Sequence, residues 1–91
     1  MATIVDVFHV LRSPRCPNRL PPRDRSLITV ASLVALYRVN ELPFHLKKAL
    51  DNGITRDELT EAITHLAFYS GWPTASSALP IAQRVFDEAG V

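Results

Sequence analysis

The chain has 91 residues, of which 47% are hydrophobic and 21% are charged, and its formal net charge is +1. A chain of this length forms one small domain with a thin core, so its apolar surplus favours self-association. Positive and negative residues are interspersed, which provides no basic surface for nucleic acid or for an anionic membrane. The composition therefore predicts one oligomeric domain without a nucleic-acid or membrane partner.

Cysteine usage and the apolar segments limit the class of protein further. A single cysteine, Cys16, excludes an intramolecular disulfide, a CxxC redox pair and a cysteine-based zinc cluster. The first residues lack the layout of a signal peptide, and the longest apolar run, LITVASLVALY, is too short to span a bilayer. We expect a cytoplasmic protein.

Proline separates the beginning of the chain from the rest. The segment SPRCPNRLPPRD contains four prolines, which remove backbone donors and disfavour helix before each of them. We expect residues 1–23 to form an N-terminal arm and residues 24–91 to form the domain. His9 lies in the arm, and we assign it no role.

The first two predicted helices follow the arm. The periodicity predicts a buried helix over about 22–38, and a second helix begins near Pro43 and ends at Asn52-Gly53, which suit a C-cap. The residues expected to face inward are Leu27, Val30, Ala31, Val34, Leu36 or Tyr37 in the first helix and Leu42, Leu46, Ala49 and Leu50 in the second.

Two further helices are predicted in the second half of the chain. TRDE, with Thr55 and Glu58, forms a capping box before a helix over about 56–70. A fourth helix begins at Pro73 and ends at Gly90, and Pro80 inside it is expected to produce a bend unless the small residues around it indicate tight packing against a neighbouring helix. No stretch alternates as a strand does, so the predicted fold class is an all-α helical bundle.

A Glu-x-x-x-His pattern occurs twice, at Glu41/His45 and at Glu61/His65, with Tyr69 four residues further on. Helical spacing places each pair on one face, where the carboxylate can orient the ring and favour its protonated form. Such pairs are more often simple surface contacts. The same groups could also ligate a metal, but the pattern offers too few carboxylates for a di-iron bundle, so we expect no metal site.

The run from Asp24 to Glu88 resembles the carboxymuconolactone decarboxylase family of the alkylhydroperoxidase-D-like superfamily. The matching pieces are Arg-Ser-Leu in the first helix, Glu-Leu-x-x-His in the second, ALDNGITRDEL, and YSGWP before a helix of small residues. The resemblance implies an all-helical homotrimer or homohexamer with its active site near the subunit contacts. It also implies decarboxylation of 4-carboxymuconolactone in aromatic catabolism without a metal or organic cofactor.

The resemblance separates two chemistries. Peroxidase members of the superfamily depend on a CxxC motif, where this chain has Leu42-Pro43-Phe44, so peroxidase chemistry is excluded. His45 falls on the characteristic histidine of the family. Decarboxylation needs a proton donor, and an arginine suits a carboxylate substrate. His45 with Glu41, or His65 with Glu61, are the catalytic candidates, and Arg25 and Arg38 are the substrate-binding ones.

Two hypotheses about arrangement follow. The first is that His65 lies buried in the same pocket as His45, with Tyr69 and Trp72 as further substrate-binding candidates, although both aromatic residues also suit packing or an interface. The second is that AFYSGWPTASSALPIA forms a subunit interface, because its small residues, Ala67, Ala75, Ala78 and the serines, allow close approach of helices. The alternative to an enzyme is a non-catalytic oligomeric helical module that binds a small acid or a protein partner.

Overall fold

A computed structural model of the chain describes residues 20–91, which form helices joined by short connections. The arm prediction for residues 1–19, with His9 and Cys16, lies outside the described residues. No strand occurs among residues 20–91, so the predicted all-α fold is confirmed. The helices are α2 (Pro22–Ala35), α3 (Leu42–Asp51), α4 (Arg56–Ser70) and α5 (Trp72–Ala89).

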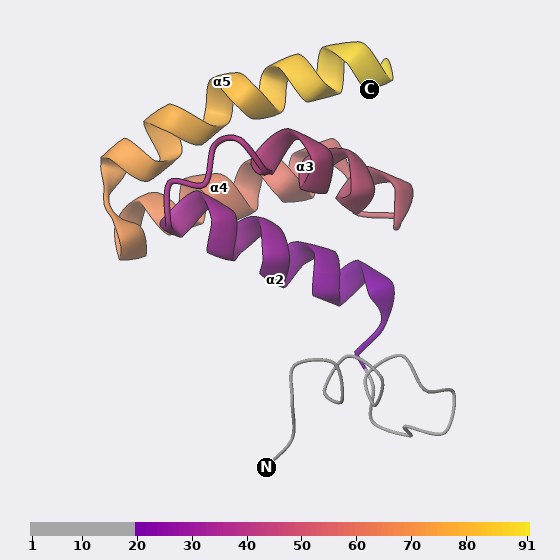
Figure 1. Cartoon of the computed structure of the whole chain (residues 1–91), viewed down its shortest axis with the longest axis horizontal. Helices are drawn as coiled ribbons and strands as arrows, with labels where there is room; N and C mark the ends of the chain where they lie inside the picture. The colour runs from indigo at the N-terminus through magenta and orange to yellow at the C-terminus, as the bar shows by residue number, and fades with distance from the viewer. Residues whose placement is uncertain (1–19) are drawn as a thin grey trace.

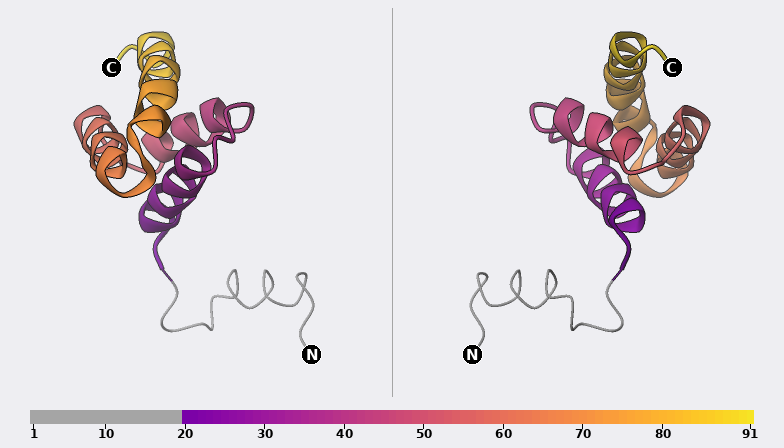
Figure 2. Two further views of the ribbon diagram at one scale, coloured as in Figure 1. Left: turned by 90° about the vertical axis from the view of Figure 1, so that its left-hand side faces the viewer. Right: turned by 90° about the vertical axis from the view of Figure 1, so that its right-hand side faces the viewer.

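The helices surround one core, with α3 and α4 on opposite sides of it. Viewed end-on, α5 and α2 lie above and below, and α3 and α4 lie at the two sides (Figure 2). The contacts agree, because α4 packs against α5 and α2, and α3 packs against α2 and α5. Figure 1 shows the same arrangement from the side, with α2 and α5 at its lower and upper edges. Any site on α3 is therefore adjacent to α2 or α5.

Local signals define most helix ends. The Thr55 side chain accepts a hydrogen bond from the Glu58 backbone N–H at 3.1 Å, and the Glu58 carboxylate accepts one from the Thr55 N–H at 3.0 Å. The predicted capping box is therefore confirmed. Gly53 after α3 and Gly90 after α5 have positive φ values of 96° and 75°, which glycine adopts without steric cost.

The first predicted helix ends earlier than expected. Tyr37 has a φ of 58°, and the Arg38 N–H bonds back to the Leu33 carbonyl at 2.9 Å, so the chain leaves the helix after Ala35. The prediction that Leu36 or Tyr37 faces the core is wrong, because their side chains are 69% and 51% exposed. The left-handed turn directs this segment away from the core.

The core consists of apolar side chains, mostly aliphatic, from every described helix. The small residues between α4 and α5 belong to it: Ala67, Ala75 and Ala78 are buried within the chain. These alanines bring α4 against α5 within the chain, and a subunit interface formed by AFYSGWPTASSALPIA remains a prediction. Pro80 lies inside α5, which continues through it to Ala89. Other buried positions include Val30, Leu42, Leu46, Ala49, Ile54, Leu59, Ile63, Ala82 and Phe86.

Candidate functional site

A polar pocket of about 480 Å³ lies between α2 and α3. Its α2 wall follows the helical spacing i, i+3, i+4 and i+7, and its α3 wall follows i, i+3 and i+7, so each helix contributes one face. The half-buried His45 lies in the α3 wall. Residues lining the pocket are Pro22, Arg25, Ser26 and Thr29 from α2 and His45, Lys48 and Asn52 from α3 and its C-cap.

The charges around this pocket have one sign. Arg25 and Lys48 are cations, His45 becomes one when it is protonated, and no carboxylate is among the lining residues. A concave surface with charges of one sign concentrates ions of the opposite sign. Arginine and lysine bind carboxylates through charge-assisted hydrogen bonds. The pocket therefore suits a small organic acid.

Two uncharged side chains join the walls of the pocket. The Asn52 side-chain amide donates a hydrogen bond to the Ser26 hydroxyl oxygen at 2.8 Å. The Arg25 Nε donates to the Leu20 carbonyl at 3.1 Å, and the Thr29 hydroxyl donates to the Arg25 carbonyl at 2.9 Å. The Asn52–Ser26 bond links the start of α2 to the end of α3, and the other two bonds are local to the beginning of α2.

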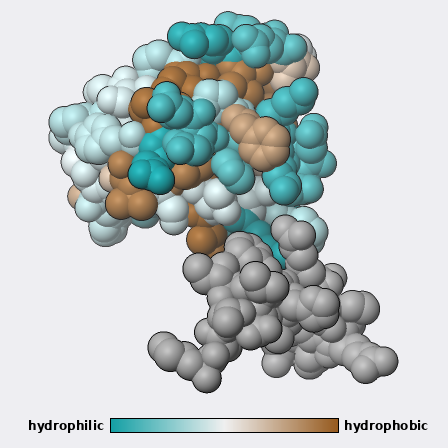
Figure 3. Space-filling model, in the orientation of Figure 1, coloured by the Kyte–Doolittle hydropathy of each residue, from teal (hydrophilic) through white to brown (hydrophobic). Residues whose placement is uncertain are grey.

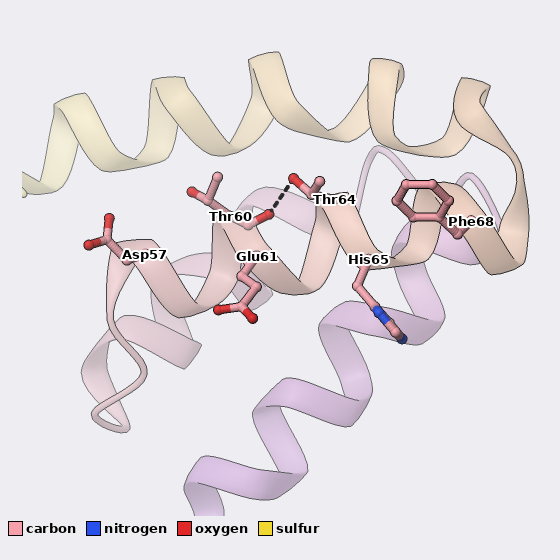
Figure 4. Close-up of a pocket in the computed structure, with 6 residues that line it drawn as sticks. All are labelled: Asp57, Thr60, Glu61, Thr64, His65 and Phe68. Carbon is pink, nitrogen blue, oxygen red and sulfur yellow. Dashed lines mark hydrogen bonds between the residues drawn. The ribbon is translucent and has the colours of Figure 1, made fainter.

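A second pocket, also of about 480 Å³, lies along the outer face of α4. The Glu61 and His65 side chains point to one side of the helix and Thr60 and Thr64 to the other (Figure 4). The Thr64 hydroxyl donates to the Thr60 carbonyl at 2.8 Å. We call this surface the α4 groove; its lining residues are Asp57, Thr60, Glu61, Thr64, His65 and Phe68.

The expected shared pocket for the two histidines is not formed within one chain. His45 lines the α2–α3 pocket and His65 the α4 groove, and their helices lie on opposite sides of the core (Figure 2). The expectation that His65 is buried is wrong, because its side chain is exposed. Ile63 and Ala67 are buried, but they lie two residues from His65, and two residues rotate a helix by about 200°.

Of the two contacts that the helical spacing of Glu61, His65 and Tyr69 allows on α4, the one between His65 and Tyr69 is formed. The His65 and Tyr69 rings lie 4.7 Å apart between centroids and are inclined at 37°. Among the hydrogen bonds and ion pairs of residues 20–91, none joins Glu61 to His65. The His65 and Tyr69 rings therefore contact each other on the exposed face of α4, and Glu61 lies one helical turn before His65.

The remaining predicted site residues lie outside both pockets. Glu41 is exposed at the N-cap of α3, where its backbone carbonyl accepts a bond from the His45 N–H at 3.4 Å. Arg38 is exposed in the connection between α2 and α3, so the structure associates Arg25 rather than Arg38 with His45. Tyr69 and Trp72 are exposed and line neither histidine pocket.

Five of the seven pocket residues were absent from the sequence-based candidates, among them Ser26, Lys48 and Asn52. Lys48 and Asn52 follow His45 at i+3 and i+7, and Ser26 follows Arg25. Helical spacing from His45 and Arg25 was therefore the sequence signal that could have identified these three residues. The Glu-x-x-x-His pattern does not identify these residues, because it requires a glutamate and no carboxylate lines this pocket.

Exposed aromatic side chains gather where α4 turns into α5. Phe68, Tyr69 and Trp72 are 70%, 77% and 63% exposed, and the Phe68 and Trp72 rings meet edge to face with centroids 5.2 Å apart. We call these three residues the aromatic surface. Figure 3 shows brown, apolar patches among polar side chains on the face of the molecule that is viewed in Figure 1. A small domain that exposes several large aromatic residues has surface suited to a protein contact.

Neither a metal cluster nor a membrane span is found in the described part of the chain. No three histidine, cysteine or acidic side chains converge there. None of the helices within residues 20–91 has the length and apolar character needed to cross a bilayer.

The fold and the pocket define a small all-helical protein with a cation-lined cavity between α2 and α3. A model of the carboxymuconolactone decarboxylase family matches residues 1–84, and the chain belongs to this family. It is similar to the 4-carboxymuconolactone decarboxylase of Acinetobacter baylyi, with 44% identity over 72 residues, which are 79% of this chain and 54% of that protein.

A fungal relative extends the comparison. The nitrosuccinic acid decarboxylase npaB of Metarhizium robertsii is 32% identical over 69 residues, which are 76% of this chain and 48% of that protein. The chain thus spans about half the length of the curated relatives it matches. Both relatives are named for removing carbon dioxide from a small organic acid.

Proposed function

We propose that this protein is a carboxy-lyase that decarboxylates a small dicarboxylic acid similar to carboxymuconolactone, as in the breakdown of aromatic compounds. The observation that carries the proposal is the α2–α3 pocket, in which Arg25, Lys48 and His45 occur without a carboxylate. The names of two relatives support the same reaction type. The chemistry needs no cofactor if the substrate itself can accept the electron pair of the broken bond.

His45 is the proposed proton donor. When the carbon–carbon bond to the carboxylate breaks, carbon dioxide leaves and its bonding electrons pass to a conjugated carbonyl or nitro group of the substrate. A carbon atom must then receive one proton, and imidazole is the side chain that gains and loses protons near neutral pH. His45 lies in the pocket wall between Arg25 on α2 and Lys48 on α3, within reach of a bound acid.

The two permanent cations are assigned to the carboxylate that stays. Decarboxylation neutralises the departing group, so a tight ion pair with that group would stabilise the substrate more than the transition state. Carboxymuconolactone and nitrosuccinic acid each retain a second carboxylate. Arg25 and Lys48 holding this second group would orient the substrate without opposing the reaction.

We further propose that the protein forms a homotrimer or homohexamer through the aromatic surface. Phe68, Tyr69 and Trp72 supply the apolar area that the alanines of α4 and α5 do not, since those alanines are buried inside the chain. Tyrosine, tryptophan and phenylalanine are enriched in protein interfaces. The proposed contact thus moves from the small residues to the large ones.

The test is carbon dioxide release by the purified chain from 4-carboxymuconolactone and, separately, from 2-nitrosuccinate. Succinate is the matched control, because it keeps both carboxylates and lacks the electron-accepting group. Release from at least one of the first two acids and none from succinate is expected. Saturable binding of both acids without release would overturn the enzyme proposal in favour of a non-catalytic module that binds small acids.

A further inference from the structure

The α2–α3 pocket contains a hydrogen bond between two uncharged side chains, those of Ser26 and Asn52. Ser26 is 7% exposed, yet it lines the pocket, and its hydroxyl oxygen accepts the Asn52 amide N–H at 2.8 Å. The two residues are 26 positions apart and come from different helical segments. The pocket therefore holds one hydroxyl at a position defined from both walls.

The Ser26 hydroxyl still has a proton to donate. A serine hydroxyl is one donor and can accept two bonds. The amide of Asn52 occupies one lone pair, and no residue within 20–91 accepts the Ser26 proton. The other hydroxyl in the pocket differs, because Thr29 already donates to the Arg25 carbonyl at 2.9 Å. Ser26 is thus the uncharged hydroxyl donor available to a bound molecule.

The proposed reaction needs such a donor. As carbon dioxide leaves, the electrons of the broken bond move to an oxygen of the lactone carbonyl or of the nitro group, where negative charge develops. Fixed hydrogen-bond donors at the position of developing charge stabilise a transition state more than they stabilise the bound substrate. A cation would stabilise this developing charge less selectively, because Arg25 and Lys48 also attract every carboxylate of the substrate.

We propose that Ser26 donates a hydrogen bond to the electron-accepting oxygen of the substrate and that Asn52 positions this hydroxyl; the inference rests on the decarboxylase function proposed above. The carbon–carbon bond breaks, carbon dioxide leaves, and the electron pair rests on the oxygen that Ser26 contacts. His45 then gives its proton to carbon, which returns the pair from oxygen and restores the neutral acceptor group.

The inference defines the substrate class more narrowly than the charges do. Arg25 and Lys48 select for carboxylates in general, whereas Ser26 selects for acids that carry a carbonyl or nitro oxygen conjugated with the carbon that loses carbon dioxide. Simple dicarboxylates would occupy the cationic groups but leave the Ser26 proton unused. Discrimination should therefore appear in turnover more than in binding.

The first experiment is kinetic. Ser26→Ala should lower kcat on the order of 100-fold, the cost of removing one oxyanion donor, while KM stays within about threefold. Ser32→Ala is the matched control, because it makes the same change at an exposed position of the same helix. Ser26→Thr, which keeps a hydroxyl, should recover much of the lost kcat.

The second experiment measures binding without turnover. The probe is 3-nitropropionate in two forms, the nitro acid and its nitronate, which carries the charge on the oxygens as the intermediate would. Wild type should bind the nitronate more tightly, and Ser26→Ala should reduce this preference about tenfold, as loss of a bond to a charged acceptor does. Asn52→Ala should reduce it less, since the hydroxyl remains but loses its orientation.

The outcomes separate this inference from the function on which it rests. If wild type releases carbon dioxide and Ser26→Ala keeps both kcat and the nitronate preference, Ser26 has no such role although the decarboxylase function stands. If wild type releases none but its nitronate preference depends on Ser26, the donor role stands and the decarboxylase function fails. If Ser26→Ala loses helical content, the preference for the nitronate is measured in Ser26→Thr and Asn52→Ala instead. An unchanged preference in Asn52→Ala overturns the positioning role of Asn52.

Discussion

The α2–α3 pocket and the α4 groove are of similar volume and each contains a histidine, but they differ in charge and in construction. The first is formed by two helices and lined by cations, and the second lies along one helix and contains Asp57 and Glu61. The same Glu-x-x-x-His pattern precedes both histidines. A repeated sequence pattern therefore acquires different surroundings, and the neighbouring helix α2 determines that the His45 copy lines a pocket whose charged residues are cations.

The most direct test of this comparison is to replace each of the two histidines separately. His45→Gln should lower kcat/KM by about 10²- to 10⁴-fold, the usual contribution of a positioned general acid, without loss of helical content. His65→Gln should lower it far less, because His65 is exposed on another helix. Rates of carbon dioxide release and circular dichroism measure the two effects.

Equal losses in the two variants would contradict the comparison. They would mean that a second copy of the chain brings its α4 groove to the α2–α3 pocket. A loss of assembly in His45→Gln, with full activity in the fraction that stays folded, would instead make His45 a structural residue.

The aromatic surface provides the next largest effect. Replacing Phe68 and Trp72 together with serine should raise the concentration at which the oligomer half-dissociates by at least about 100-fold, since buried aromatic anchors carry much of the binding energy of an interface. Both side chains are exposed in the single chain, so helical content should stay constant. Light scattering over a dilution series measures the change, and Ser77→Ala, also exposed on α5, is the control.

The two arginines distinguish pocket from periphery. Arg25→Met should raise KM about 30-fold, in the range of a lost hydrogen bond to a charged group, and should change kcat less. Arg38→Met should have no comparable effect, because Arg38 does not line the pocket. Steady-state kinetics with one substrate test the pair, and equal changes in KM would remove the preference for Arg25.

The smallest effect concerns the start of α4. The Thr55 backbone N–H, and then the Arg23 side chain, lower the pKa of Glu58 below its ordinary value of 4.5. Because the folded-state pKa is the lower one, the contribution of Glu58 to stability is present above pH 4.5 and is lost as the pH falls through the folded-state pKa. Thermal unfolding at several pH values should show a decline on the acid side that is smaller in Glu58→Gln.

Thr55→Ala provides an independent measure of the same cap. Losing the hydrogen bond that the Glu58 N–H donates to the Thr55 hydroxyl should lower the free energy of unfolding by about 1 kcal/mol. Urea denaturation at neutral pH measures this change. No loss in Thr55→Ala would mean that the capping box contributes nothing to the stability of α4.

The sequence by itself determined the helices and the family of this protein. Proline in first turns, glycine after last turns and the Thr55 capping box act within one helical turn, so they can be recognised without knowing the fold. His45 and Arg25 could also be selected from the sequence as candidate site residues. His45 was found through the family motif, and Arg25 as a cation suited to a carboxylate. The early end of α2 was missed because Tyr37 adopts a left-handed conformation that favours glycine or asparagine.

Only the tertiary structure decided which residues share a site. Ser26 and Asn52 meet although they are 26 positions apart, whereas His45 and His65 do not meet although they share a motif. Ala67, Ala75 and Ala78 proved to be core residues, whereas Phe68, Tyr69 and Trp72 are exposed. The physical reason is that helix formation depends on nearby residues, while the pairing of helices depends on how all apolar faces are buried together.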